Sequence, residues 1–308
     1  MRTIILALFA AGCAGSFPDK KPELRPATTE AGVRHEEAFF EGAGGLRLFS
    51  QSWQPEGAPR AMLIIVHGLK DHGSRYAAAA AQLAQKGIAV HAADLRGHAK
   101  SDGRRVYIDS FDEYLEDLKI FVQRVRKPGV PLFLMGHSMG AAISTLFVLA
   151  NKPELHGLLL SAGALKVDVG GFTIGMTKMM AFIGPRLALF SLDADAFSRD
   201  ASVRKADAAD PLIDPGKAPV RTAVELLKAI DRLREKSGEL EVPLLAMHGS
   251  ADKITPPEGS KELIERARGK DKTLKTYEGL FHDLLHEPEK AQVLADITGW
   301  IEQRIASK

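Results

Sequence analysis

The stretch from Leu132 to Ala142, L-F-L-M-G-H-S-M-G-A-A, constrains the fold of this chain more than any other. An apolar run ends at Gly136, Ser138 follows two residues later, and helical spacing of apolar residues begins after Gly140. G-x-S-x-G between a strand pattern and a helix pattern is typical of a sharp turn that holds a nucleophilic serine clear of the backbone. The N-terminus of the following helix can also stabilise an oxyanion. We therefore expect a strand, a tight turn and a helix, with Ser138 as a nucleophile.

Strand and helix patterns alternate on both sides of this turn. Buried-strand patterns are expected at 61–68, 88–93, 132–135, 157–161, 242–249 and 273–277. Helical spacing is expected at 75–86, 111–127, 257–268 and 288–305. Two further strand-like runs, 37–40 and 46–53, flank a glycine-rich turn. This alternation predicts right-handed crossovers and an α/β fold with a largely parallel sheet. Residues 165–240 show no strand pattern but a helical one at 223–233, which indicates an inserted helical cap.

The first thirteen residues, M-R-T-I-I-L-A-L-F-A-A-G-C, are expected to contain a secretion signal. Their apolar run, Ile4–Ala11, is far too short to span a bilayer as a helix. A charged start, an apolar core and small residues before a boundary are typical of a cleaved signal. The small residues before Cys13 resemble a bacterial lipobox, in which the cysteine is lipidated and becomes the mature N-terminus. The alternative is an ordinary signal peptide with an incidental cysteine.

The lipobox resemblance implies a signal peptide at 1–12, a lipidated tether at 13–32 and a folded domain at 33–308. Residues 14–32 contain three prolines, many charges and little apolar content, so they are expected to form no core of their own. In such signals an alanine after the cysteine, here Ala14, favours the outer membrane of the bacterial cell envelope. A lipid at Cys13 would hold the domain beside a membrane surface.

Composition and charge limit the kinds of partner, cofactor and metal site that are expected for this chain. The formal net charge is +2 with both signs interspersed, which does not suggest nucleic acid. No phosphate-binding glycine motif follows a strand, so no nucleotide cofactor is expected. Cys13 is the sole cysteine, which excludes an intrachain disulfide and a thiolate metal cluster. The H-D-L-L-H stretch at His282 and His286 superficially resembles a zinc pair, but Asp283 replaces the glutamate of that motif and Pro288 follows closely. We therefore expect neither a cofactor nor a metal.

A serine is a weak nucleophile near neutral pH and needs a base that a carboxylate orients. Serine enzymes built on this turn carry the partners in the order Ser, Asp or Glu, His. Asp252 follows a buried strand in H-G-S-A-D-K, and His282 follows the last strand in E-G-L-F-H. Both lie where a parallel sheet presents its ligand-binding loops. His286 is the weaker base because it lies farther from the strand end. Asp94 also follows a strand, but before Ser138, and spacing alone leaves it as a rival carboxylate.

The developing oxyanion needs two N–H donors. One is expected from the backbone of Met139, the residue after the serine, and the other from Leu69, in the loop after the strand at 61–68. Removing one such donor typically lowers the rate about 100- to 1,000-fold.

Several separated stretches resemble one family. They are H-G-L-K-D-H-G-S-R-Y (His67–Tyr76), D-L-R-G-H-A-K-S-D-G (Asp94–Gly103), G-H-S-M-G (Gly136–Gly140), D-P-L-I (Asp210–Ile213), G-S-A-D-K (Gly249–Lys253) and Y-E-G-L-F-H (Tyr277–His282). Together they are similar to the monoacylglycerol lipase and lysophospholipase group of serine α/β-hydrolases. This resemblance implies an eight-stranded sheet, a helical cap and a triad of Ser138, Asp252 and His282. It also implies hydrolysis of a monoacylglycerol or lysophospholipid to a free fatty acid.

The same resemblance implies that Asp71, Arg75 and His137 hold the head group of the substrate. The apolar cap stretch at 170–184 is expected to pack over the sheet, or to line an acyl tunnel or contact a membrane. Two alternatives remain open: an envelope carboxylesterase for short acyl esters, and a non-catalytic binding lipoprotein that retains the fold.

Overall fold

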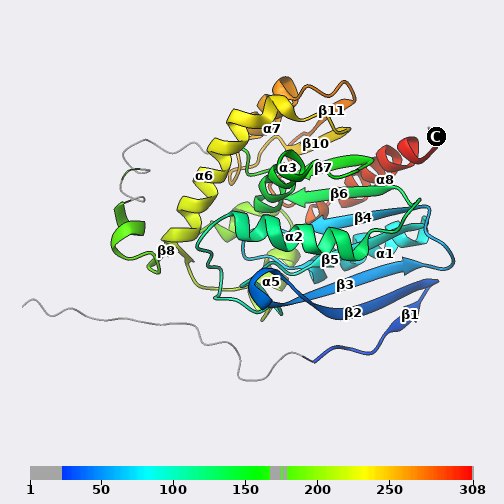
Figure 1. Ribbon diagram of the computed structural model, residues 1–308, viewed down its shortest axis with the longest axis horizontal. Helices are drawn as coiled ribbons and strands as arrows, with labels where there is room; N and C mark the ends of the chain where they lie inside the picture. The colour runs from blue at the N-terminus through cyan, green and yellow to red at the C-terminus, as the bar shows by residue number, and fades with distance from the viewer. Residues whose placement is uncertain (1–22, 167–174, 176–178, 307–308) are drawn as a thin grey trace, which may run out of the picture.

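A central sheet runs through the molecule, and helices cover both of its faces (Figure 1). The computed structural model describes residues 23–166, 175 and 179–306. The strands are β1 (Thr28–Glu30), β2 (Val33–Glu41), β3 (Arg47–Pro55), β4 (Ala61–Val66), β5 (Ile88–Ala93), β6 (Leu132–His137), β7 (Gly157–Ser161), β10 (Leu244–Gly249) and β11 (Lys272–Tyr277). Their order in the sheet is β1-β2-β3-β5-β4-β6-β7-β10-β11. Strands β4 to β7, β10 and β11 pair in parallel, and β1 to β3 add an antiparallel edge.

Helices lie on both faces of this sheet, as the alternating patterns predicted. The helices of the sheet layers are α1 (Ala77–Gln85), α2 (Asp112–Val125), α3 (Met139–Asn151), α7 (Pro257–Arg266) and α8 (Lys290–Ala306), whereas α5 (Ala201–Ala209) and α6 (Val220–Lys236) belong to the cap. Figure 1 shows α2 and α3 in front of the sheet and α1 and α8 behind it.

The core forms two apolar layers, one on each face of the sheet. Along β4, Met62 and Ile64 pack into the layer with α2 and α3, whereas Leu63 and Ile65 pack into the layer with α1 and α8. All residues of β4 and β6 are buried. A parallel strand covered on both faces has no solvent side, which explains why these strands read as continuous apolar runs.

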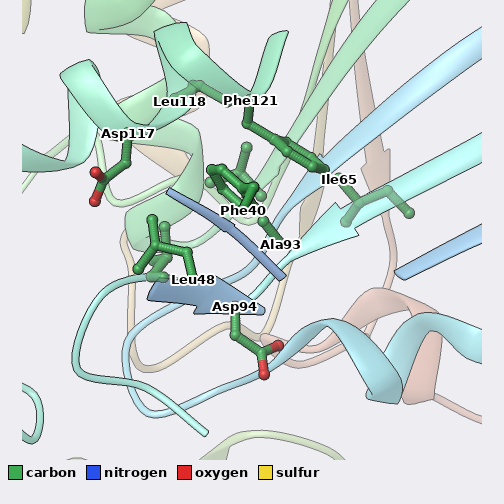
Figure 2. Close-up of a pocket in the computed structure, with 10 residues that line it drawn as sticks. Phe40, Leu48, Ile65, Ala93, Asp94, Asp117, Leu118 and Phe121 are labelled. Carbon is green, nitrogen blue, oxygen red and sulfur yellow. The ribbon is translucent and has the colours of Figure 1, made fainter. Parts of the chain in front are cut away.

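Figure 2 shows where α2 meets the sheet, with Phe40 and Phe121 side by side. Their rings stack with centroids 5.1 Å apart. The cavity left between these side chains, Leu118 and the strands is about 20 Å³, room for a single water molecule at most. This junction is therefore a packed part of the core and too small for a substrate.

Two expectations about strands were wrong. A ninth strand, β1, lies inside the segment 13–32 that was expected to be a tether, so the sheet begins at Thr28 and has one strand more than the eight expected. Its residues are polar and exposed. It is held by backbone pairing to β2 and by an ion pair between Arg25 and the buried carboxylate of Glu37, neither of which leaves an apolar pattern.

The cap also contains strands. Two short segments, β8 (Ala188–Phe190) and β9 (Ala218–Pro219), pair antiparallel within the region that was expected to be helical. Strands of two or three residues are too short to show the alternation of apolar and polar residues that identifies a strand in a sequence. The expected helix at 223–233 is the centre of α6, which packs on α3.

The cap lies beyond the carboxyl ends of β4 and β6, whose arrows point towards it in Figure 1. Residues 1–12, Cys13 and most of the apolar stretch at 170–184 lie outside the described residues. Within the described ranges, every helix is too short or too polar to cross a bilayer.

Candidate active site

Ser138 occupies the turn between β6 and α3, as the motif predicted. Its backbone has φ 53° and ψ −120°, a region that side chains rarely adopt. The flanking glycines make this turn possible, because a Cβ at Gly140 would lie 2.1 Å from the carbonyl oxygen of Val66, and one at Gly136 would lie 2.3 Å from that of Gly140. The strand and helix therefore approach so closely that only glycine fits on either side of the serine.

The loop after β4 lies against the same serine. A Cβ placed on Gly68 would lie 3.1 Å from the Cβ of Ser138. Leu69, the next residue, lines the cavity that contains Ser138. Met139 is the first residue of α3. The two residues expected to supply oxyanion donors thus flank the serine, one from each side of the turn.

Asp252 and His282 are brought together by the loops after β10 and β11. Nδ1 of His282 lies 2.8 Å from Oδ2 of Asp252, and both side chains are buried. Burial would raise the pKa of Asp252, but hydrogen bonds from His248 and His282 outweigh it and hold this pKa well below its ordinary value. Asp252 is therefore ionised at neutral pH and able to stabilise a positive charge on His282.

The other ring nitrogen of His282 is free to act. Its Nε2 is buried and has no hydrogen-bond partner among the described residues, so in this arrangement His282 is bonded to Asp252 and not to Ser138. His137, the neighbour of Ser138, lies with its ring centroid 4.9 Å from that of His282. The structure thus connects the serine turn to His282 through the contact between the two histidine rings. In unliganded enzymes the hydrogen bond between nucleophile and base is often long, and it tightens when substrate binds.

Two further side chains, which the sequence did not predict, complete the surroundings of Asp252. The hydroxyl of Thr255 donates to Oδ2 at 2.9 Å, and Nε2 of His248 lies 3.1 Å from the same oxygen. His248 is fully buried at the end of β10. The signal for it was the H-G-S-A-D stretch itself, because the ring at the end of β10 comes only four residues before the carboxylate.

Arg75 lies under the cavity and is surrounded by carboxylates. Its guanidinium lies 3.2 Å from Asp71, 2.9 Å from Asp207 and 2.8 Å from Asp283. Asp71 also accepts a hydrogen bond from the hydroxyl of Tyr76 at 2.8 Å. Burial would raise the pKa of Asp71, but Arg75 and the other neighbours hold it well below its ordinary value. Asp71 and Arg75 line the cavity, with their charges already paired.

One cavity of about 520 Å³ contains Ser138 and the three side chains expected at the head group, Asp71, Arg75 and His137. Burial lowers the pKa of His137 to about 4, so this ring is neutral at physiological pH. The remaining wall comes from the cap. Its apolar part consists of Leu192, Ala194, Phe197, Ala208, Ala209, Pro211, Ile213 and Pro215. The edge of the Phe197 ring also contacts His282, with centroids 5.6 Å apart.

The rival candidates have other partners. Asp94 accepts hydrogen bonds from the backbone of Gly73 and Lys100, at 2.9 and 3.1 Å. His286 lies 2.8 Å from Asp283 and 3.0 Å from the carbonyl oxygen of Arg75, so it does not face His282 as a second ligand would. In the part of the chain that the structure describes, no three His, Cys, Asp or Glu side chains are grouped to hold a metal ion.

A serine on a strained strand-to-helix turn, followed in the chain by an aspartate and a histidine that contact each other, defines a serine hydrolase of the α/β type. The sequence profile described as "Serine aminopeptidase, S33" matches residues 57–289, well over half of the chain, so the protein belongs to this family.

The chain covers nearly the whole length of several known relatives. The chain is 34% identical over 269 residues to the monoacylglycerol lipase of Mycolicibacterium smegmatis, covering 86% of this chain and 96% of that one. It is 32% identical over 293 residues to the human monoglyceride lipase, covering 92% and 97%. Among solved structures, the monoacylglycerol lipase of Paleococcus ferrophilus is 28% identical with a TM-score of 0.76, covering 83% and 99%. The α/β-hydrolase fold expected from the motifs is confirmed.

Proposed function

We propose that this protein is a carboxylic ester hydrolase that cleaves monoacylglycerols to free fatty acid and glycerol. The observation that carries the proposal is the position of Ser138 on its strained turn, inside a cavity whose other walls are apolar cap residues and a polar cluster. An ester with one acyl chain and a hydroxyl-rich head fits such a two-part cavity. The relatives named above are monoacylglycerol and monoglyceride lipases, so neither a short-ester carboxylesterase nor a binding lipoprotein is needed.

In the first half of the reaction, the Ser138 hydroxyl attacks the ester carbonyl while Nε2 of His282 takes its proton. Asp252 holds the imidazole by the 2.8 Å contact to Nδ1 and stabilises the imidazolium. The backbone N–H groups of Leu69 and Met139 stabilise the oxyanion. When the tetrahedral intermediate collapses, His282 protonates the glycerol oxygen, and the acyl group remains on Ser138.

In the second half, water replaces the alcohol. His282 accepts a proton from the water as it attacks the acyl-enzyme, and returns that proton to Ser138 as the fatty acid leaves. Neither half requires a cofactor or metal.

The head group interacts with Asp71, Arg75 and His137. Around Arg75 the carboxylates outnumber the cations, because Asp71 and Asp207 of the cavity wall and the buried Asp283 all lie within 3.2 Å of its guanidinium. Glycerol hydroxyls can donate hydrogen bonds to these carboxylates, whereas a phosphate would be repelled by them and would find Arg75 already paired. This charge balance supports a neutral glycerol head over the phosphate head of a lysophospholipid.

Two features support a position at the membrane. Exposed apolar residues gather at one end of the cap: Met179, Phe182, Ile183, Leu187 and Leu189, with Phe182 90% exposed. Exposed apolar side chains of this kind favour contact with the headgroup and acyl boundary of a bilayer. A lipid on Cys13 anchors the protein to the bacterial envelope, at the outer membrane, and brings the cavity to an amphiphilic substrate.

A hydrolysis panel tests the activity. Wild type and Ser138→Ala are compared on monoacylglycerols of varied chain length, short p-nitrophenyl esters and anionic lysophospholipids. We expect monoacylglycerols to give the highest kcat/KM and Ser138→Ala to lose activity on all of them. Full monoacylglycerol hydrolysis by Ser138→Ala would overturn the proposal, and faster cleavage of lysophospholipids would overturn the choice of head group.

The anchor has its own test, the Cys13→Ala variant of the full chain. We expect this variant to leave the membrane fraction and to keep its activity on monoacylglycerol in detergent. A variant that remained in the membrane fraction would show that the lipid on Cys13 is not the anchor.

A further inference from the structure

A second histidine contacts the carboxylate oxygen that His282 uses. Nε2 of His248 lies 3.1 Å from Oδ2 of Asp252, and Nδ1 of His282 lies 2.8 Å from that same oxygen. His248 is fully buried and is not among the residues that line the cavity around Ser138. Any effect of His248 on the reaction must therefore pass through the groups that it contacts, Asp252 and Thr255.

The surroundings of His248 decide which ring nitrogen carries the proton. Nε2 lies near two acceptors, Oδ2 of Asp252 and, at 3.0 Å, the carbonyl oxygen of Thr255. Neither of them can donate a hydrogen bond, and the Thr255 hydroxyl, 3.3 Å from Nε2, donates to Asp252 instead, so Nε2 carries the hydrogen. Nδ1 lies 2.7 Å from the hydroxyl of Ser260 in α7, which can donate to it. A neutral His248 with its proton on Nε2 satisfies all of these groups, and Ser260 selects that tautomer.

Asp252 is thereby held at both oxygens. Oδ1 accepts the backbone N–H groups of Ile254 and Thr255, at 2.8 and 3.0 Å. Oδ2 accepts the Thr255 hydroxyl and Nε2–H of His248 in addition to His282. Because Oδ2 is the oxygen that orients His282, the donors that fix its position also fix the imidazole.

Gly249, the residue after His248, allows the end of β10 to approach the loop that carries His282 closely. A Cβ on Gly249 would lie 2.2 Å from the carbonyl oxygen of Leu280, just before His282 in the chain. The end of β10 therefore contacts the loop that carries His282, and His248 lies next to this contact.

We propose that His248 is a positioning residue of the reaction: its Nε2–H fixes Oδ2 of Asp252, and Ser260 fixes its tautomer. This inference rests on the proposed function, because it requires that Ser138, His282 and Asp252 perform the hydrolysis. No substrate contact is assigned to His248.

The test compares His248→Leu, which removes the donor, with His248→Gln, which supplies an amide N–H near the position of Nε2. We expect His248→Leu to lower kcat on a monoacylglycerol about 10- to 100-fold, the range seen when a ligand at a metal site loses the hydrogen-bond partner that orients it. KM should stay unchanged, and His248→Gln should recover to within about threefold of wild type.

The pH profile gives a readout that a merely structural role would not move. A carboxylate that has lost one donor attracts the imidazolium of His282 more strongly, so the acid limb of kcat/KM should move to higher pH in His248→Leu. His91→Leu, which replaces a histidine on β5 away from the site, is the matched control and should leave kcat and the profile unchanged.

Three results would overturn the inference: a kcat within twofold of wild type in His248→Leu, an equal loss in the Leu and Gln variants, or an unmoved acid limb. If His248→Leu does not fold, Ser260→Ala takes its place. Removing this hydroxyl should lower kcat several-fold at constant KM, and an unchanged kcat would overturn the inference. Retained activity in Ser138→Ala would instead overturn the proposed function, so the two failures are distinguishable.

Discussion

Two walls of the same cavity are built in contrasting ways. The wall that carries Ser138 consists of β6 and α3, where all of β6 and the helix from Met139 to Leu149 are buried. The wall formed by α5 contains no buried residue. This helix is held at its end by an ion pair between Asp207 and Arg75, at 2.9 Å, and by a hydrogen bond between Asp210 and His72, at 3.0 Å.

The contrast indicates that the wall with Ser138 governs the chemical step and that the wall formed by α5 governs substrate binding. Dense apolar packing leaves a side chain little freedom, which suits a nucleophile that must meet its base within a fraction of an ångström. Ion pairs at a partly exposed surface are weaker and respond to salt. We therefore expect changes near Ser138 to lower kcat or unfold the protein, and changes at α5 to act on KM.

The largest effect is expected from Asp252→Asn, which changes the partner of the base that serves Ser138 on the packed wall. An amide cannot stabilise the imidazolium and presents the wrong partner to Nδ1 of His282, so kcat should fall about 10⁴-fold, as it does in serine proteases. Steady-state kinetics on a monoacylglycerol measure this, with KM expected to change little. A kcat within tenfold of wild type would mean that Asp252 does not orient the base.

The second-largest effect is expected from Gly140→Ala, which tests the packing of the turn around Ser138. The added methyl would meet the carbonyl oxygens of Val66 and His67, at 2.1 and 2.6 Å, and neither backbone group can move freely. We expect a loss of about 3 kcal/mol in the free energy of unfolding, the upper range for overpacking, together with loss of activity. Denaturant unfolding measures the first quantity.

Gly299→Ala in α8 is the matched control, because nothing lies within 4 Å of a Cβ there. Replacing a helical glycine with alanine should stabilise by about 0.5–1 kcal/mol. Equal stability changes at Gly140 and Gly299 would show that the turn is not tightly packed.

A smaller effect is expected on the ionic side, from Asp207→Asn. This variant keeps the shape of the side chain but loses the ion pair between α5 and Arg75. We expect KM for a monoacylglycerol to rise about three- to tenfold, which corresponds to about 1 kcal/mol, while kcat stays within about twofold. The difference from wild type should shrink in 1 M salt, because salt weakens the wild-type pair.

Asp231→Asn, at an exposed position on α6, is the control for Asp207→Asn and should leave KM unchanged. A fall in kcat at constant KM in Asp207→Asn would contradict the division between the two walls.

The smallest effect concerns pH and His286. Burial would lower the pKa of His286, but Asp283 raises it overall above its ordinary value. Charged His286 therefore contributes stability that is fully present below pH 6.5 and is lost as the pH rises through the raised pKa. We expect His286→Gln to lose about 1 kcal/mol of unfolding free energy at pH 6, the size of one hydrogen bond, and less at pH 9. A loss that grew with pH would contradict this assignment.

The sequence predicted the packed wall far better than the ionic one. Gly136, Ser138 and Gly140 lie within five residues, so one local pattern defines the turn. Arg75 meets Asp207 and Asp283 across 132 and 208 residues, and no local pattern encodes which distant carboxylates will surround a guanidinium. For the same reason the family resemblance, which implied a head-group role for Arg75, did not show that its charge is already paired.

The other misses have similar causes. His248 was overlooked because a histidine at the end of a buried strand resembles any other core residue until its partners on α7 and the Asp252 loop are known. Strand β1 was overlooked because an exposed polar segment pairs through its backbone alone.

The most direct test of the central claim uses an alkyl fluorophosphonate and peptide mapping by mass spectrometry. We expect a single phosphonyl group on Ser138, formed more slowly when a monoacylglycerol is present and absent in Ser138→Ala. Stoichiometric labelling of another residue, or labelling of Ser138 at a rate that monoacylglycerol does not change, would contradict the claim that Ser138 is the nucleophile of a monoacylglycerol hydrolase.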